Sequence, residues 1–280
     1  MKVDFPNRLA QSDVRRGGGA SHRFIRSLGN AHMWESLSRI TLLAVLVTTS
    51  YSAADPRWCV DIESGAVFTG YNDVCIPGDV GTLISLSEEL TTNPAFFLRG
   101  RLTYRIADRH AIGLLVAPLR LHGEGSVGKT VRFEDEEFAP HIPLIAVYEF
   151  NSYRLTYHYG VLRSRNLEMD IGLTGKIRDA AIRLERNGQA VEKRNTGFVP
   201  LIHFGILWKF ANEFALFLNG DALAAPQGRA EDILCALCYE AHPNVQIKLG
   251  YRILEGGADV SEVYNFALLH YVVAGVVCSF

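Results

Sequence analysis

The chain has 280 residues and a formal net charge of −2, which excludes the strongly basic balance typical of proteins that bind nucleic acid. Hydrophobic residues make up 48 % of the sequence, yet after residue 52 no apolar run is long enough to cross a bilayer as a helix. The five cysteines are irregularly spaced, so they indicate no disulfide framework.

The first 52 residues are predicted to be an N-terminal extension that ends in a signal peptide. Residues 41–49 form an apolar run of signal-peptide length, and small residues at positions 50 and 52 fit cleavage before Ala53. Met33 is a candidate start, in which case residues 1–32 would be an upstream artefact. We therefore expect an exported mature chain, residues 53–280, that forms one domain.

From residue 58 onward the dominant pattern is a two-residue alternation, which predicts β-strands. Residues 58–68 place Val60 and Ile62 on one face and Asp61 and Glu63 on the other. The other clear strands repeat this contrast between an apolar face and a charged face. Ten strands are expected, at residues 58–68, 96–106, 110–121, 144–161, 167–185, 197–210, 214–223, 232–241, 245–254 and 265–280.

Short and long breaks alternate between these strands. The short breaks are at residues 107–110, 163–166, 211–214 and 242–244. The long breaks are at residues 69–95, 122–143, 186–196, 224–231 and 255–264. This alternation is typical of a barrel with short turns at one end and long loops at the other. The period slips near Asn151 and Asp179, which we interpret as bulges or protruding strand ends.

Many strands with one apolar and one charged face, after an export signal, favour a barrel that turns its apolar face to lipid and its charged face to a wet lumen. The last strand adds a motif of alternating apolar residues that ends in an aromatic, namely Val272, Ala274, Val276, Cys278 and Phe280. In this pattern the chain resembles the Gram-negative outer-membrane β-barrel proteins, whose last strand typically ends in Phe.

The resemblance implies an all-β fold, a single antiparallel transmembrane barrel with short periplasmic turns and long extracellular loops. Ten strands are expected, within a range of eight to twelve. It also implies a location in the outer membrane and contact with its lipid and lipopolysaccharide. The five residues of the terminal motif would form the signal for the barrel-assembly machinery. We expect a monomer and no nucleic-acid partner.

Residues 123–130, GEGSVGKT, match the GxxxxGKS/T pattern of a phosphate-binding loop. In such a loop Lys129 would reach the β- and γ-phosphates and Thr130 would bind Mg²⁺, at the N-terminus of a helix. The residues that follow alternate and lead into Pro140, so they predict no helix. We interpret the motif as a Gly-rich surface loop and keep a P-loop nucleotide binder as a remote alternative.

Extending the alternation to the inner faces predicts a charged lumen. The basic members are Arg99, Arg101, Arg105, Arg154, Lys176, Arg178, Lys209, Lys248 and Arg252. The acidic members are Asp61, Glu63, Glu168, Asp170 and Asp221, and His203 is also expected to face inward. A ten-stranded barrel encloses little more than side chains and some water, so these charges are expected to pair into a plug. A narrow, weakly anion-selective pore is the alternative.

We predict an integral outer-membrane barrel with a structural role or a narrow-pore transport role. The histidines are scattered without metal-ligand spacing, so no metal site and no other cofactor are expected. Two alternatives stay open. One is a lipid-directed hydrolase, for which no catalytic residues can be placed, and the other is a protein that binds partners through its surface loops.

Overall fold

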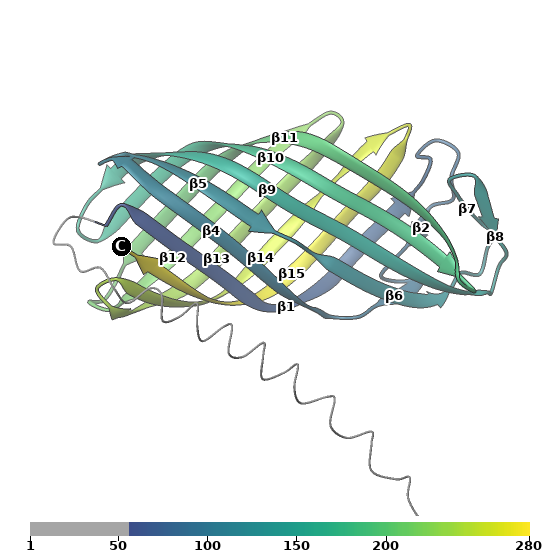
Figure 1. The fold of residues 1–280 in the computed structure, drawn as a ribbon, viewed down its shortest axis with the longest axis horizontal. Coiled ribbons are helices and arrows are strands. Elements are labelled where there is room, and N and C mark those ends of the chain that lie inside the picture. Colours follow the sequence, from purple (N-terminus) through teal and green to yellow (C-terminus); the bar gives the residue numbers. More distant parts are fainter. Residues whose placement is uncertain (1–55) are drawn as a thin grey trace, which may run out of the picture. The chain divides into compact units, whose positions relative to one another are not determined.

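The computed structural model describes residues 56–280. The predicted extension and signal peptide at residues 1–52, with the candidate start at Met33, lie outside the described residues. Within residues 56–280 no helix is long and apolar enough to span a membrane. The described chain forms antiparallel strands that close into one barrel (Figure 1).

Ten strands form the wall when β5 and β6 are counted as one interrupted strand. They are β1 (Trp58–Cys75), β4 (Ala95–Ala107), β5 (His110–Ala117) with β6 (Arg120–Ser126), β9 (Pro143–Arg163), β10 (Leu167–Arg186), β11 (Gln189–Lys209), β12 (Phe214–Ala225), β13 (Gly228–His242), β14 (Val245–Val260) and β15 (Val263–Ser279). Each pairs antiparallel with the next, and β15 pairs with β1, so the wall has no free edge. Pro118 separates β5 from β6 because it has no N–H to donate to a neighbouring strand. The predicted fold class is confirmed.

The first and last strands meet at one end of the barrel, which we call the terminal end. There the backbone N–H of Trp58 donates to the carbonyl of Phe280 at 2.9 Å, and that of Phe280 donates to the carbonyl of Trp58 at 2.9 Å. Four short turns lie at this end, at residues 108–109, 164–166, 210–213 and 243–244. They confirm the predicted short breaks to within a residue or two. In barrels of this class the short turns face the periplasm.

Three of the five predicted long loops are wrong: the breaks at 186–196, 224–231 and 255–264 are hairpins. Strands continue through them, and turns of only two residues join β10 to β11, β12 to β13, and β14 to β15. The first of these turns is Asn187–Gly188, and both residues have positive φ (50° and 83°), as a type I′ turn requires. The sequence suggested loops because these strand ends carry charges on both faces.

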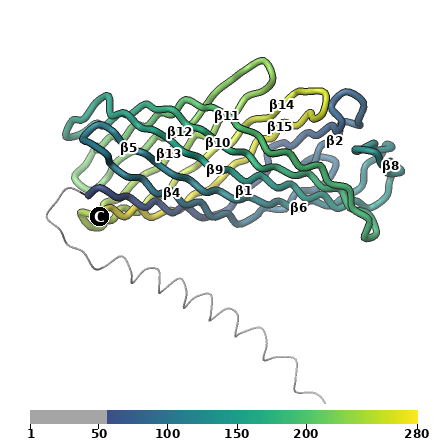
Figure 2. The backbone as a smooth tube through the Cα atoms, turned by 45° about the horizontal axis from the view of Figure 1, so that its top comes forward, coloured from purple at the N-terminus to yellow at the C-terminus, as the bar shows by residue number. Residues whose placement is uncertain are grey.

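The two remaining connections at this end, which we call the loop end, have small strands of their own (Figure 2). Residues 76–94 include β2 (Ile84–Ser85) and β3 (Leu90–Thr92), and residues 127–142 include the hairpin of β7 (Val131–Phe133) and β8 (Glu136–Phe138). β2 pairs with β1 and β3 pairs with β6, so both connections are built onto the wall.

Of the two interpretations of the slip near Asn151 and Asp179, bulges or protruding strand ends, the bulges are absent from the described strands, where the two residues face each other in an unbroken register. What changes there is the chemistry of the two faces. On β9 below this level, Tyr153 points outward and is exposed, whereas Arg154 points inward and is buried. Above it, the inward residue Tyr148 is buried and apolar. The alternation is intact, but its polarity inverts.

The neighbouring strand β10 inverts at the same level. Leu173 and Ile177 are exposed below it, whereas Ile182 and Leu184 are buried above it. A wall that is apolar outside and charged inside suits lipid, and a wall that is polar outside and apolar inside suits water. The inversion therefore marks the level at which the barrel leaves the membrane, and we call the part beyond it the head.

Below the inversion the outer surface is a continuous apolar belt. Leu173 is 69 % exposed and Phe198 67 % exposed. Monomeric soluble proteins rarely present so large an apolar surface to water. At the terminal end the belt is edged by aromatic rings, such as Trp58 and Tyr104, whose centroids lie 4.5 Å apart. Such girdles are typical of outer-membrane barrels.

The interior of the head is a hydrophobic core that the two loop-end connections help to fill. The barrel wall contributes side chains such as Phe97, Leu184 and Leu269. The connections contribute Ile76, Ile84, Leu86, Leu90, Val127, Val131, Phe133 and Phe138, all of them buried. The connections therefore close the barrel at the loop end.

Candidate functional site

The lumen below the head is crossed by an ionic layer. The register between β1 and β4 pairs Asp61 with Arg101 and Glu63 with Arg99, all four of them predicted lumen residues. The shortest contacts of these acids are nevertheless with β14. Lys248 Nζ donates to Asp61 Oδ2 and to Glu63 Oε1, each at 2.7 Å.

Glu63 is a buried acid with three cationic partners. The Arg252 guanidinium donates to Glu63 Oε1 at 2.8 Å and to Oε2 at 2.7 Å. Lys248 Nζ also donates to Oε1, and Arg99 Nε lies 3.5 Å from Oε2. The backbone register thus brings Glu63 and Arg99 together, whereas long side chains from β14 supply the closer pairing.

Asp232 on β13 is the centre of the layer, and it was not among the predicted lumen residues. It is 3 % exposed. Its Oδ2 accepts hydrogen bonds from Arg99 at 2.9 Å and from Arg154 at 2.6 Å, and its Oδ1 accepts one from Arg252. One carboxylate therefore joins guanidiniums from β4, β9 and β14.

Asp221 on β12 extends the layer toward the far wall. Its Oδ2 accepts a hydrogen bond from Arg154 at 2.6 Å, and its Oδ1 accepts one from Thr174 at 2.8 Å. The same Oδ1 lies 2.9 Å from Nδ1 of His203, which is fully buried. A continuous chain of ion pairs and hydrogen bonds thus runs from β1 across the lumen to β11.

The layer is balanced in charge and, apart from Asp61, buried. Its four carboxylates are Asp61, Glu63, Asp221 and Asp232, and its four cations are Arg99, Arg154, Lys248 and Arg252. The Lys248 side chain packs against Gly275, where any larger residue would clash, because a Cβ at Gly275 would lie 2.6 Å from Lys248 Cε. Arg101 borders the layer and donates to Asn219 Oδ1 at 3.3 Å.

The other predicted lumen residues lie outside this layer. Lys176 is buried, with its Nζ 4.7 Å from the centre of the Phe150 ring. Arg178 donates to Asn195, toward the head. Lys209 lies near the terminal end, 3.8 Å from Glu168. The structure thus brings together only part of the predicted set.

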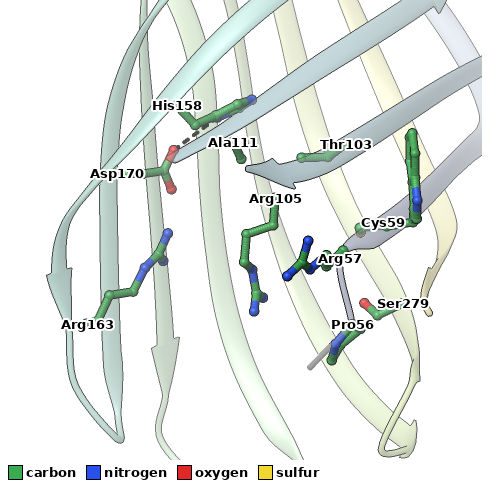
Figure 3. A pocket seen from close by; sticks show the side chains of 11 residues that line it. Pro56, Arg57, Cys59, Thr103, Arg105, Ala111, His158, Arg163, Asp170 and Ser279 are labelled. Atoms are coloured by element: carbon green, nitrogen blue, oxygen red, sulfur yellow. Dashed lines mark hydrogen bonds and ion pairs between the residues drawn. The ribbon is translucent and has the colours of Figure 1, made fainter. Parts of the chain in front are cut away.

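A cavity of about 200 Å³ lies at the terminal end of the lumen (Figure 3). Three arginines line it, Arg57, Arg105 and Arg163, together with His158 and Asp170. The predicted lumen residue Arg105 therefore faces this cavity and takes no part in the ionic layer.

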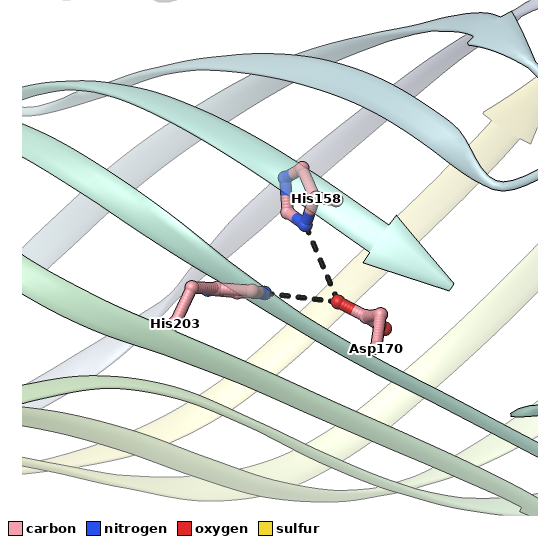
Figure 4. A group of neighbouring side chains, drawn as sticks. All are labelled: His158, Asp170 and His203. Carbon is pink, nitrogen blue, oxygen red and sulfur yellow. Dashed lines mark hydrogen bonds and ion pairs between the residues drawn. The ribbon is translucent and has the colours of Figure 1, made fainter. Parts of the chain in front are cut away.

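At the inner side of this cavity the structure brings together His158, Asp170 and His203 (Figure 4). Asp170 Oδ1 lies 3.3 Å from His158 Nδ1 and 3.3 Å from His203 Nε2. The two imidazole rings meet nearly edge to face, with centroids 4.4 Å apart. The expectation that the histidines are merely scattered does not hold for these two.

The sequence carried signals for the residues that were missed. On β13, Ile233, Leu237 and Tyr239 face outward, so simple alternation places Asp232 inside. The signal was weak because Asp232 precedes an inner face that is otherwise apolar. On β9 the alternation of aromatic residues likewise places His158 inside.

The GxxxxGKS/T motif lies on an ordinary strand and loop. Gly123 and Gly125 belong to β6, and strand β7, not a helix, follows the motif. Lys129 lies 3.2 Å from Glu89 with its side chain half exposed. The helix N-terminus that a P-loop needs is missing from this part of the described chain.

The predicted assembly motif forms part of the lipid-facing surface. Val272, Val276 and Phe280 are 56 %, 43 % and 48 % exposed, Ala274 is also exposed, and Cys278 is half-buried. Val276 and Cys278 lie opposite residues of β1, so the motif sits where the barrel closes.

No protein-family model and no curated protein matches this sequence. Solved structures do match. The outer membrane protease OmpT from Escherichia coli is similar with a TM-score of 0.52 and 11 % identity, over 83 % of this chain and 100 % of that chain. Ail, the attachment invasion locus protein of Yersinia pestis, reaches a TM-score of 0.38 at 11 % identity, over 80 % of this chain and 99 % of that chain.

The similarity extends to the fold. This chain and OmpT share a closed antiparallel barrel, and the lower score for Ail supports no further comparison. The outer-membrane location predicted from the sequence agrees with this fold and with the apolar belt on its outer face.

Proposed function

We propose that the protein is an integral outer-membrane barrel with a closed lumen and a structural role. The observation that carries this proposal is the ionic layer. Four carboxylates and four cations bond to one another across the lumen, from Asp61 on β1 to Asp221 on β12. An ion in transit would have to break several of these pairs and leave buried charges without partners, which is costly.

The head provides a second barrier in series with the first. A hydrated ion that passed the layer would next meet the apolar core, where Ile84, Leu90 and Phe133 are almost fully buried. Polar solutes lose their hydration in such surroundings without compensation. Both barriers belong to the resting fold, so a structural role fits the geometry better than transport.

The charge balance also weakens the case for an anion-selective pore. That alternative rested on an excess of basic residues among the predicted lumen charges. Asp232 supplies a missing acid, and Lys176, Arg178 and Lys209 lie outside the layer. The constriction is therefore close to neutral.

The hydrolase alternative finds no nucleophile at the paired histidines. Among the described residues no serine, threonine or cysteine side chain is hydrogen-bonded to His158 or His203. The similarity to OmpT concerns the fold and adds no support for proteolysis.

We further propose that the belt contacts outer-membrane lipid and lipopolysaccharide and that one chain suffices, because a single chain closes its own wall. The five residues of the terminal motif are proposed to meet the assembly machinery before closure. The polar outer surface of the head is the part of the barrel available to soluble partners.

Proteoliposomes test the closed lumen. Purified protein is reconstituted into vesicles loaded with a small fluorescent anion, beside protein-free vesicles and vesicles that contain a general porin. The proposal predicts retention equal to that of the protein-free vesicles. Release of the anion at the rate seen with the porin would show an open path.

A further inference from the structure

We propose that His158, Asp170 and His203 bind a divalent transition-metal ion such as Zn²⁺ at the inner side of the terminal cavity. Two imidazoles and one carboxylate form a donor set that suits such ions, and three protein ligands leave a coordination position open. The proposal does not depend on the closed lumen, because the site lies on the cavity side of the ionic layer.

The strand register builds the site. His158 on β9 and His203 on β11 both lie directly opposite Gly172 on β10, on its two sides. Asp170 lies two residues before Gly172, on the same inward face of β10. Three neighbouring strands therefore each aim one donor at a common point, and all the donor atoms lie within 4.8 Å of one another.

The separations also suit a metal ion. Asp170 Oδ1 lies 3.3 Å from each imidazole nitrogen, which is within hydrogen-bond reach but longer than the commonest 2.9–3.0 Å of an N–H···O bond. Bonds of about 2.0–2.1 Å to a tetrahedral Zn²⁺ place neighbouring ligand atoms roughly 3.3–3.4 Å apart. A modest rotation of the two rings would bring their nitrogens to the same separation from each other.

The tautomer of His203 is fixed by its surroundings. Asp221 Oδ1 lies 2.9 Å from Nδ1 and, as part of a carboxylate, requires a donor, so the proton resides on Nδ1. Arg101 donates to Asn219 Oδ1, which turns the Asn219 amide N–H toward His203 Nε2 at 3.3 Å. In the neutral imidazole, Nε2 therefore carries the lone pair.

That lone pair points at an anion, since Asp170 Oδ1 lies 3.3 Å from His203 Nε2. Two acceptors in such a position repel each other unless a proton or a metal ion lies between them. The contact from His203 Nδ1 to the Asp221 carboxylate is also the outer-shell arrangement that orients metal-bound histidines. Arg154 already neutralises Asp221, so the negative charge available to balance a bound cation is that of Asp170.

Neighbouring glycines leave space for the ligands. A Cβ at Gly205 would overlap the carboxylate of Asp170, and one at Gly113 would lie 3.1 Å from His158 Nε2. That same Nε2 is buried and has no hydrogen-bond partner among the described residues. His158 Nδ1, the nitrogen that faces Asp170, is therefore the one that would bind the ion.

The open coordination position faces the cavity that His158 and Asp170 line. Arg57, Arg105 and Arg163 line the same cavity, so water or a small anion is the expected additional ligand. The ion would thus be reachable from the terminal end.

Zinc binding by the folded, untagged chain tests the proposal. Protein in detergent is stripped with a chelator and titrated with ZnCl₂ in competition with a chromogenic chelator. We expect one ion per chain at micromolar or tighter affinity, and at least about 100-fold weaker binding in Asp170→Asn and in His158→Gln. The control His270→Gln removes a histidine that faces outward and bonds Tyr251, and it should bind zinc as wild type does.

Two results of the titration would overturn the proposal. One is the absence of micromolar zinc binding by wild type, and the other is undiminished binding by folded Asp170→Asn or His158→Gln. X-ray absorption at the zinc edge of the wild type gives an answer even if a variant fails to fold. Nitrogen and oxygen neighbours at about 2.0–2.1 Å support the site, whereas sulfur neighbours would assign the zinc to cysteines.

Discussion

Asp232→Asn should destabilise the barrel more than any neighbouring isosteric change, because Asp232 joins three guanidiniums. Its Oδ2 accepts from Arg99 and Arg154, and its Oδ1 accepts from Arg252. Whichever oxygen becomes the amide nitrogen of asparagine, its N–H groups point at a guanidinium donor. The substitution also leaves the buried layer with one uncompensated positive charge.

The expected loss follows from the burial of the pair. Removing one partner of a buried ion pair costs about 3–5 kcal/mol. Asp232 is 3 % exposed and has three partners, so we expect the upper part of that range, ~4–5 kcal/mol. At about 2–4 °C per kcal/mol for a chain of this size, the melting temperature should fall by roughly 8–20 °C.

The matched control is Glu231→Gln, which makes the same chemical change one residue earlier on the exposed outer face. Thermal unfolding in detergent, followed by circular dichroism and by heat-modifiable migration on a gel, compares the two variants with wild type. Glu231→Gln should shift the melting temperature by no more than a degree or two. Equal shifts in both variants would refute the assignment of Asp232 as the centre of the layer.

Three further predictions test other parts of the structure. Phe280→Asp should leave the chain exported but not inserted, because Phe280 closes the wall against Trp58 on the lipid side; normal heat-modifiable migration of this variant would count against the assembly role. Lys129→Ala should leave folding unchanged, and ATP should give no thermal shift, because the motif lacks a helix N-terminus; ATP binding that disappears in Lys129→Ala would reverse this conclusion. Glu255→Gln should lower head stability at neutral pH and have no effect in acid. Burial raises the pKa of Glu255, but hydrogen bonds from Arg229 and Tyr71 and the charge of Arg229 outweigh it and hold the pKa below its usual value. A lowered folded pKa contributes stability above the ordinary value near 4.3, and this is lost as pH falls through the folded value. A stability difference that persists in acid would therefore contradict the pairing.

Local alternation predicted much of the fold. The contrast between Ile62 and Glu63, repeated along the chain, indicated the barrel, its ten strands and, for the strands with clear alternation, the side that faces the lumen. The presence of Glu63 and Arg99 on one inner face also agrees with the alternation, and the antiparallel register sets them opposite each other. These features depend on residues close in sequence or on neighbouring strands.

Contacts across the lumen could not be predicted in the same way. Glu63 on β1 bonds Lys248 and Arg252 on β14. β14 comes near β1 only because β15 lies between them and pairs with β1 to close the wall. The meeting of His158 with His203 depends on two registers at once, both set against Gly172. Local sequence fixes neither the stagger of the barrel nor the reach of long side chains.

The inversion at Asn151 and Asp179 was visible in the sequence, where it was interpreted as bulges or protruding strand ends; the bulges are wrong, and the protruding ends agree with the head. The apolar residues change face there, which looks like a slip in register when every strand is assumed to stay in the membrane. In the structure the register is continuous, and what changes is the surroundings of the outer face, from lipid to water. The same assumption made the hairpin around Asn187–Gly188 look like a loop, although the dipeptide itself indicates a tight turn.

Single-channel recording in a planar bilayer tests the central claim most directly, because small ions are the most sensitive probe of an open path through the lumen. Wild-type protein, shown to be inserted by its heat-modifiable migration, should give no steady conductance above that of the protein-free bilayer. A steady, ohmic conductance from wild-type protein would contradict a lumen closed by the ionic layer and the core of the head.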